Sequence, residues 1–158
     1  MITFPRIALP CSRTPLPTSE ALVGRADAIV LAKAQPRALH DTVTFQIVET
    51  LKGIVPTPLI AVAGELTADD DVNDSPFPYQ FVRRGGRHGN CFAKTYRAGR
   101  EYLLMLRPTD PTTAVRLPFA PRVTPYWEAL APTNEQVTGT TDRWVVWVRA
   151  QVAKSLPR

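Results

Sequence analysis

The chain has 158 residues, of which 44% are hydrophobic and 21% are charged. This length and composition are typical of one globular domain, and they exclude a chain that is disordered throughout. No uncharged apolar run reaches about 18 residues, so no membrane-spanning helix is expected. The net charge of +5 is compatible with binding to nucleic acid or acidic surfaces, and equally with solubility alone.

The first part of the chain is predicted to be an extended arm followed by a short helix. Residues 1–17 contain four prolines, which favour an extended conformation. Thr18 supplies a capping hydroxyl and Glu20 an early acid, as residues at the start of a helix do. We expect this helix to end near Arg25.

Three strands are expected next. Residues 26–34 (ADAIVLAKA) are apolar at nearly every position, which is typical of a strand buried on both faces and bounded here by Pro36. Residues 42–51 alternate between apolar and polar until Val48 breaks the phase, and such a change indicates a β-bulge. Residues 58–63 predict a third strand, with a proline at its first position.

The region that follows is the least regular part of the sequence. Residues 65–90 contain an acidic cluster at 69–74 and a basic, glycine-rich loop at 83–90. A loop of this length in a compact domain is usually functional or mobile. Beyond it, residues 101–107 predict a strong strand and residues 113–117 a weaker one.

The end of the chain predicts an irregular segment and then a helix over residues 142–155. Tyr126 and Trp127 in the irregular segment are expected to fill the core. Four apolar residues share one face of the helix: Trp144, Trp147, Val148 and Val152. Short strands with turn residues between them favour a mainly β fold, a small barrel or sandwich, with the terminal helix packed on it.

No strong catalytic or metal-binding motif is present. His88 and Cys91 lie three residues apart, but zinc needs more ligands than they supply, and an exposed loop histidine is the better interpretation. The acidic cluster begins like a calcium loop but has Asp74 at the sixth position and Gln80 at the twelfth, which favours a solvated run of charges. We therefore expect no enzymatic activity, no metal and no cofactor.

The basic loop supplies the candidate binding residues. Arg83, Arg84 and Arg87 could form an anion-binding nest, although exposed arginines beside a mobile loop are the simpler interpretation. Binding of nucleic acid is the alternative function, and it would add Tyr96 and Arg97 to these arginines. The position of Tyr96 on one face of a strand favours core packing instead, so nucleic acid is the less favoured partner.

Four segments follow Cys11-Ser12 in order: SEALVGRADAIVLAKA (19–34), TFQIVETLKG (44–53), GNCF (89–92) and AGREYLLML (98–106). In this order and spacing the chain resembles the netrin-like (NTR) domain. That domain is the OB-fold module of the tissue inhibitors of metalloproteinases, and it is found also in netrins, complement components and bacterial secreted proteins.

The resemblance implies the architecture of the whole chain. It implies a five-stranded OB-fold-like Greek-key barrel, with a short N-terminal helix and a C-terminal helix packed on it. Residues 1–17 would form the proline-rich arm and residues 18–120 the barrel. Residues 121–158 would complete the same domain with the irregular segment and the helix.

The resemblance also implies a disulfide, a site and a compartment. Cys11 would be bonded to Cys91, and the contact surface would combine Cys11, Ser12 and Arg13 with the loop near Cys91. In the inhibitors the matching cysteine is the N-terminus and chelates the zinc of the target protease, whereas ten residues precede Cys11 and Arg13 replaces a second cysteine.

The expected partner is another protein, such as a zinc metalloprotease. The expected location is secreted or periplasmic, with the targeting segment outside this chain, and cytoplasmic is the alternative.

Overall fold

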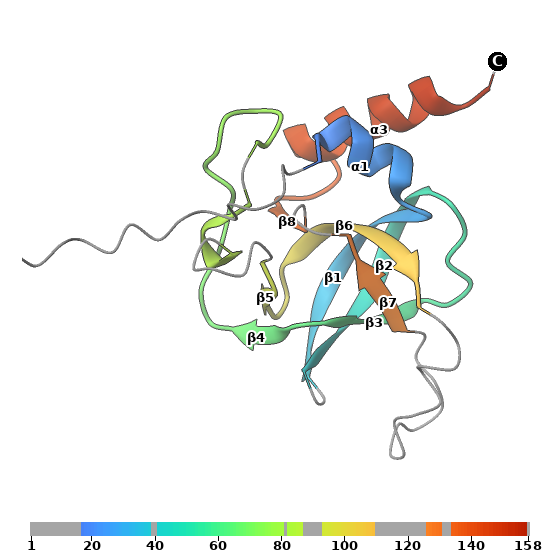
Figure 1. The fold of residues 1–158 in the computed structure, drawn as a ribbon. Helices are drawn as coiled ribbons and strands as arrows, with labels where there is room; N and C mark the ends of the chain where they lie inside the picture. Colours follow the sequence, from blue (N-terminus) through green and yellow to red (C-terminus); the bar gives the residue numbers. More distant parts are fainter. Residues whose placement is uncertain are drawn as a thin grey trace, which may run out of the picture.

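A computed structural model describes residues 17–38, 41–80, 82–86, 93–109, 126–130 and 134–157. The fold is mainly β, and it consists of a closed five-stranded barrel with two helices against one side (Figure 1). This architecture confirms the fold class predicted from the sequence. The expected weak strand at 113–117 lies outside the described residues.

Five strands form the barrel: β1 (Ala28–Ala38), β2 (Thr42–Lys52), β3 (Leu59–Ala63), β6 (Glu101–Pro108) and β7 (Tyr126–Ala129). β1 pairs antiparallel with β2 on one edge and with β6 on the other. β2 pairs with β3, β3 runs parallel to β7, and β7 pairs antiparallel with β6, which closes the ring. A closed ring with one parallel pair in this order is the Greek-key path of an OB-fold-like barrel.

The first strand is buried on both faces, as its unbroken apolar sequence predicts. Ala28 and Val30 belong to the interior of the barrel, whereas Ile29 and Leu31 pack outward against the helices. The strand continues through Pro36, so the predicted boundary is wrong. Proline is tolerated there because the pairing with β6 ends earlier along β1 and the pairing with β2 is irregular at this point.

The bulge predicted in the second strand is present. The ladder between β1 and β2 passes from Ile47 to Glu49 between two consecutive residues of β1, so Val48 is an extra residue. Leu51 is skipped in the same way one step further along. Because a bulge bends a strand and increases its twist, these two positions allow β2 to follow the curve of the barrel.

The first helix, α1 (Ser19–Arg25), begins where the sequence predicts. The side-chain oxygen of Thr18 accepts a hydrogen bond from the backbone N–H of Ala21 at 3.2 Å, which satisfies one of the unpaired N–H groups of the first turn. Leu22 and Val23 are buried. They anchor the helix on the outward face of β1 and β6.

The last helix, α3 (Arg143–Ser155), lies beside α1 over the barrel (Figure 1). Asp142 caps it and accepts a hydrogen bond from the backbone N–H of Trp144 at 2.8 Å. Trp144, Val148 and Val152 are buried as expected, whereas Trp147 is only partly buried. Among the described residues, no helix is long and apolar enough to cross a membrane.

Three very short strands complete the structure: β4 (Glu65–Thr67), β5 (Thr95–Arg97) and β8 (Glu135–Val137). β4 and β5 pair in parallel, and β8 pairs with the first half of β6. β5 contains Tyr96, which the sequence places on a strand, whereas β4 and β8 are too short for a recognisable alternation of apolar and polar positions and were not predicted. The segment predicted to be irregular also contains β7, in which Trp127 is buried as expected.

Candidate functional site

Residues 69–80 and 82–86 lie beside the barrel near β5 and β8 (Figure 1), and their polar and charged side chains contact these two strands. This segment ends in a single 3-10 turn, η1 (Arg84–Gly86). Arg83, immediately before the turn, is completely buried. We call the group of hydrogen bonds and ion pairs around this side chain the Arg83 network.

The guanidinium of Arg83 has partners on three separate segments. Its Nη1 donates to Asp71 Oδ2 at 2.8 Å, and its Nε donates to the carbonyl of Asn134 at 2.7 Å. Its Nη2 donates to the carbonyl of Ala93 at 3.4 Å. Because a charge removed from water is tolerated only when it is paired and hydrogen-bonded, these contacts hold the three segments together.

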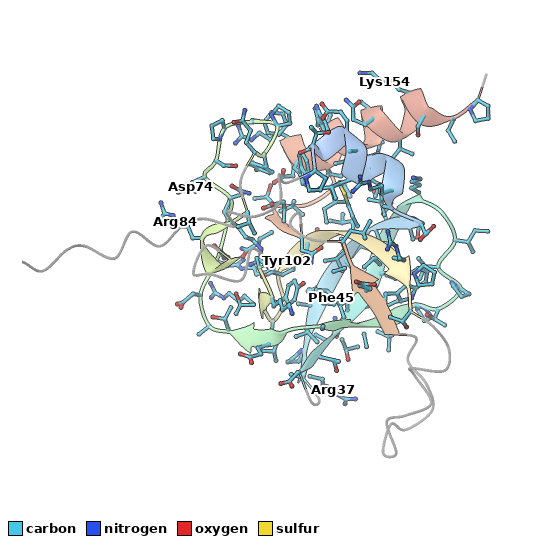
Figure 2. All side chains as sticks on the ribbon, in the orientation of Figure 1. Arg37, Phe45, Asp74, Arg84, Tyr102 and Lys154 are labelled. Carbon is cyan, nitrogen blue, oxygen red and sulfur yellow. The ribbon has the colours of Figure 1, made fainter. Side chains whose placement is uncertain are left out.

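Aromatic rings of the barrel interior lie beneath Arg83. The guanidinium carbon lies 5.3 Å from the ring centre of Tyr96 and 5.4 Å from that of Tyr102. The Tyr96, Tyr102 and Phe45 rings meet edge to face, and Figure 2 shows Tyr102 and Phe45 among the barrel strands. Burial raises the pKa of Tyr102. The rings therefore link the core of the barrel directly to the buried cation.

The acidic cluster takes part in the same network. Asp70 accepts hydrogen bonds from Gln136 Nε2 at 2.7 Å and from Arg100 Nε at 2.9 Å, and it also pairs with Arg97. The hydrogen bonds from Gln136 and Arg100 hold the pKa of Asp70 below its ordinary value. Asp69, Asp70 and Asp74 are exposed, as a solvated run of charges predicts, and Asp70 in addition joins β5, the following turn and β8.

Further contacts fix the rest of the segment. Asp71 Oδ2 accepts a hydrogen bond from the backbone N–H of Gly85 at 3.0 Å, in addition to its bond from Arg83. Asn73 is buried, and its Nδ2 donates to Glu135 Oε1 at 2.9 Å. The acidic cluster is thus attached to η1 through Asp71 and to β8 through Asn73.

Arg84 lies on the outer side of this arrangement. Its side chain is 74% exposed and its Nη2 lies 2.7 Å from Asp74 Oδ2. Figure 2 shows the two side chains close together at the edge of the molecule, far from Lys154 at the end of α3. Two adjacent arginines thus differ completely: one is buried inside the network and the other is presented to solvent.

The predicted site residues differ in their exposure to solvent. The expectation of an accessible Arg83 is wrong because that side chain is fully buried, whereas Arg84 is exposed as predicted. Tyr96 is buried in the core, as its position in the sequence favours, and it is not available to stack on a nucleic-acid base. Five other predicted residues lie outside the described residues: Cys11, Ser12, Arg13, Arg87 and Cys91.

A cleft of about 370 Å³ adjoins the network. Its walls carry both signs of charge, and they are formed by Asp41, Ala63, Gly64, Glu65, Gly85, Lys94 and Thr95. Within the part of the chain that the structure describes, no group of three or more histidine, cysteine or acidic side chains is arranged to hold a metal ion. The geometry around the cleft therefore indicates no particular ligand.

Sequence reasoning missed the contribution of residues 134–136. Asn134 donates through Nδ2 to the hydroxyl of Tyr96 at 2.9 Å, and Gln136 accepts from the backbone N–H of Asp71 at 2.9 Å. These residues lie more than thirty positions from their partners in the sequence, and no motif marks them. No protein-family model matches the chain, and no curated protein matches it.

Proposed function

We propose that the protein is an extracytoplasmic protein-binding module of the netrin-like type, with no catalytic activity of its own. The observation that carries this proposal is the buried Arg83, which holds residues 69–80 and 82–86 in one arrangement beside the barrel. A buried ion pair is strongly destabilising when it is incomplete. Here the complete network fixes a surface segment, which is the property expected of a recognition surface.

Preorganisation explains why such a network suits a binding role. Ordering a loop at the moment of association reduces affinity, whereas a loop that is already ordered avoids this cost. The network presents Arg84, and arginine is enriched at the centre of protein interfaces. An exposed arginine next to Asp74 offers a partner both signs of charge in a defined position.

The alternative, binding of nucleic acid, receives less support from the same contacts. Proteins that bind single strands combine a basic groove with exposed aromatic rings. In this chain Tyr96 is buried, Arg83 is buried, and Arg97 is paired with Asp70. Three of the five residues expected for that function are therefore occupied by contacts within the protein.

Charge reversal at Arg84 tests the proposal. Arg84→Glu is expected to weaken binding of the natural partner at least about tenfold, because the change inverts an exposed charge of the presented segment. The partner would be isolated from the extracytoplasmic fraction of the source cells on the immobilised protein, and its affinity measured by biolayer interferometry. The thermal midpoint should remain unchanged, since the ion pair with Asp74 is exposed.

Arg149→Glu is the matched control. Arg149 also makes a single exposed ion pair, with Glu49 at 3.0 Å, but it lies on α3. This variant should bind the partner as the unmodified chain does. Equal losses in the two variants, or no specific partner at all, would contradict a recognition surface at Arg84.

The narrower form of the proposal is inhibition of a zinc metalloprotease, which follows from the resemblance at Cys11 and Ser12. A chain that begins at Cys11 is expected to inhibit a zinc endopeptidase, because its free α-amine and carbonyl would chelate the catalytic zinc. The same chain with its ten preceding residues should not inhibit, because an amide replaces the amine. Cleavage of a fluorogenic peptide measures both, a chain beginning at Ser12 is the control, and equal inhibition by the long and short forms would refute chelation.

A further inference from the structure

A second group of aromatic side chains lies outside the barrel, where residues 75–79 meet the first turn of α3 (Figure 1). The ring centres of Tyr79 and Trp144 lie 5.0 Å apart, and Trp144 stacks on Trp147 at the same distance. The ring of Phe77 meets Tyr79 edge to face at 5.6 Å. We call these four residues the aromatic corner.

The aromatic corner reaches the surface, unlike the rings inside the barrel. Trp144 is fully buried and Tyr79 nearly so, but Phe77 is 36% exposed and Trp147 is partly exposed. Interface hot spots are rich in tryptophan and tyrosine, which bury large areas on contact. Phe77 and Trp147 each contact the buried Trp144, so two partly exposed apolar rings share one buried aromatic base.

A cation lies beside this area. The guanidinium carbon of Arg143 lies 4.7 Å from the ring centre of Phe77 and 5.7 Å from that of Tyr79. Arg143 has no carboxylate within ion-pair distance among the residues that the structure describes. Five other arginines each pair with one: Arg83, Arg84, Arg97, Arg100 and Arg149.

The nearest carboxylate in the sequence is committed elsewhere. Asp142 accepts hydrogen bonds from the backbone N–H groups of Trp144 and Thr138, at 2.8 and 3.0 Å, and so caps α3. Arg143 also interacts with the side chain of Tyr79, but this neutral partner leaves the positive charge of Arg143 for an external group at the aromatic corner. A carboxylate supplied by a partner would complement that charge, and a basic partner would be repelled.

The aromatic corner is held from a second side. The hydroxyl of Ser19, in the first turn of α1, donates to the carbonyl of Tyr79 at 3.0 Å, and both residues are buried. The backbone N–H of Ser75 donates to Asn73 Oδ1 at 2.9 Å, which fixes the start of the segment. Both contacts preorganise the rings, which reduces the entropy lost on association.

We propose that the aromatic corner and Arg143 form a docking site for an acidic segment of a partner protein. An apolar side chain of that segment would cover Phe77 and Trp147, and a neighbouring carboxylate would pair with Arg143. This inference rests on the proposed protein-binding function, but it uses different residues from the surface around Arg84. It states the chemistry of the partner: acidic, with an apolar anchor.

The indole N–H signals of the three tryptophans provide the test. The ¹⁵N-labelled full chain is titrated with a blocked synthetic peptide that alternates glutamate with leucine, and with a second peptide that has lysine for every glutamate. The acidic peptide should shift the indole signals of Trp144 and Trp147 saturably, because they belong to the aromatic corner. The signal of Trp127, which is buried in the barrel core, should not move.

Two variants on α3 distinguish the effect of the Arg143 charge from the effect of any change on the surface of this helix. Arg143→Gln is expected to weaken binding of the acidic peptide at least about fivefold, because it removes a charge-assisted contact. Val146→Ala changes an exposed residue on the same helix and should leave the affinity unchanged. Arg84→Glu should also leave it unchanged. If Arg84→Glu no longer binds the natural partner but Arg143→Gln still does, this inference is therefore wrong and the proposed function stands.

The remaining outcomes all overturn the proposal. No saturable shift with the acidic peptide removes the docking site, and equal shifts with the lysine peptide remove its charge selectivity. Tighter binding of a peptide that copies residues 1–16 would assign the aromatic corner to the chain's own arm. Shifts that depend on protein concentration without any peptide would assign it to a second copy of the chain.

Discussion

Replacement of Arg83 by methionine is expected to lower the free energy of unfolding by about 3–5 kcal/mol, as the loss of one partner of a buried ion pair does. Methionine fills much of the same volume but provides no donor. Asp71 would keep a charge in a side chain that is only 11% exposed. The carbonyls of Asn134 and Ala93 would each lose a buried hydrogen bond. Urea denaturation followed by circular dichroism measures the change.

Arg84→Met is the matched control, since the neighbouring arginine is exposed and its ion pair is exposed. This variant should change the free energy of unfolding by no more than about 0.5 kcal/mol. Adding Asp71→Asn to Arg83→Met should recover part of the loss, because the second change neutralises the unpaired carboxylate. A loss below about 1 kcal/mol in Arg83→Met would show that the Arg83 network does not hold the segment in place.

The Arg83 variant also connects stability with the proposed function. Arg83 is buried and has no direct access to a partner. Its guanidinium nevertheless fixes Asp71, and Asp71 in turn accepts a hydrogen bond from Gly85 within η1. If Arg83→Met weakens partner binding, the cause would therefore be a change in the position of the neighbouring Arg84.

Local signals in the sequence predicted the parts of the fold that depend on local chemistry. Thr18 and Asp142 each supply a capping oxygen, and both helices begin next to them. The phase change at Val48 predicted the bulge because alternation records directly which face of a strand is buried. The unbroken apolar run around Val30 predicted a strand covered on both sides.

The Arg83 network could not be predicted because its partners are brought together only by the fold. Two adjacent arginines in a glycine-rich loop look equivalent, and the sequence contains nothing that selects Arg83 for burial. That selection depends on Asn134, which lies 51 residues away, and on the tyrosines that form the floor beneath the guanidinium. The contacts of Asp70 could not be predicted for the same reason, since Arg100 and Gln136 lie 30 and 66 residues away from it in the sequence.

Gly64→Ala is expected to lower the free energy of unfolding by about 2–4 kcal/mol, through overpacking and backbone strain together. Gly64 connects β3 to β4 with a φ of +155°, a value that residues with a side chain rarely adopt. An added Cβ would lie 2.4 Å from the carbonyl oxygen of Lys94 and 2.6 Å from the ring of Tyr96. Neither neighbour can move freely, because the Lys94 carbonyl accepts a hydrogen bond from Glu65 and the Tyr96 ring is buried in the core.

Gly24→Ala provides a control of opposite sign. An added Cβ at Gly24 meets nothing within 4 Å, and alanine is favoured over glycine in a helix by up to about 1 kcal/mol. This variant should therefore be slightly more stable than the unmodified chain in the same urea titration, whereas Gly64→Ala should unfold at a lower urea concentration. Equal stability of Gly64→Ala and the unmodified chain would mean that the close approach of β4 to β5 does not constrain this position.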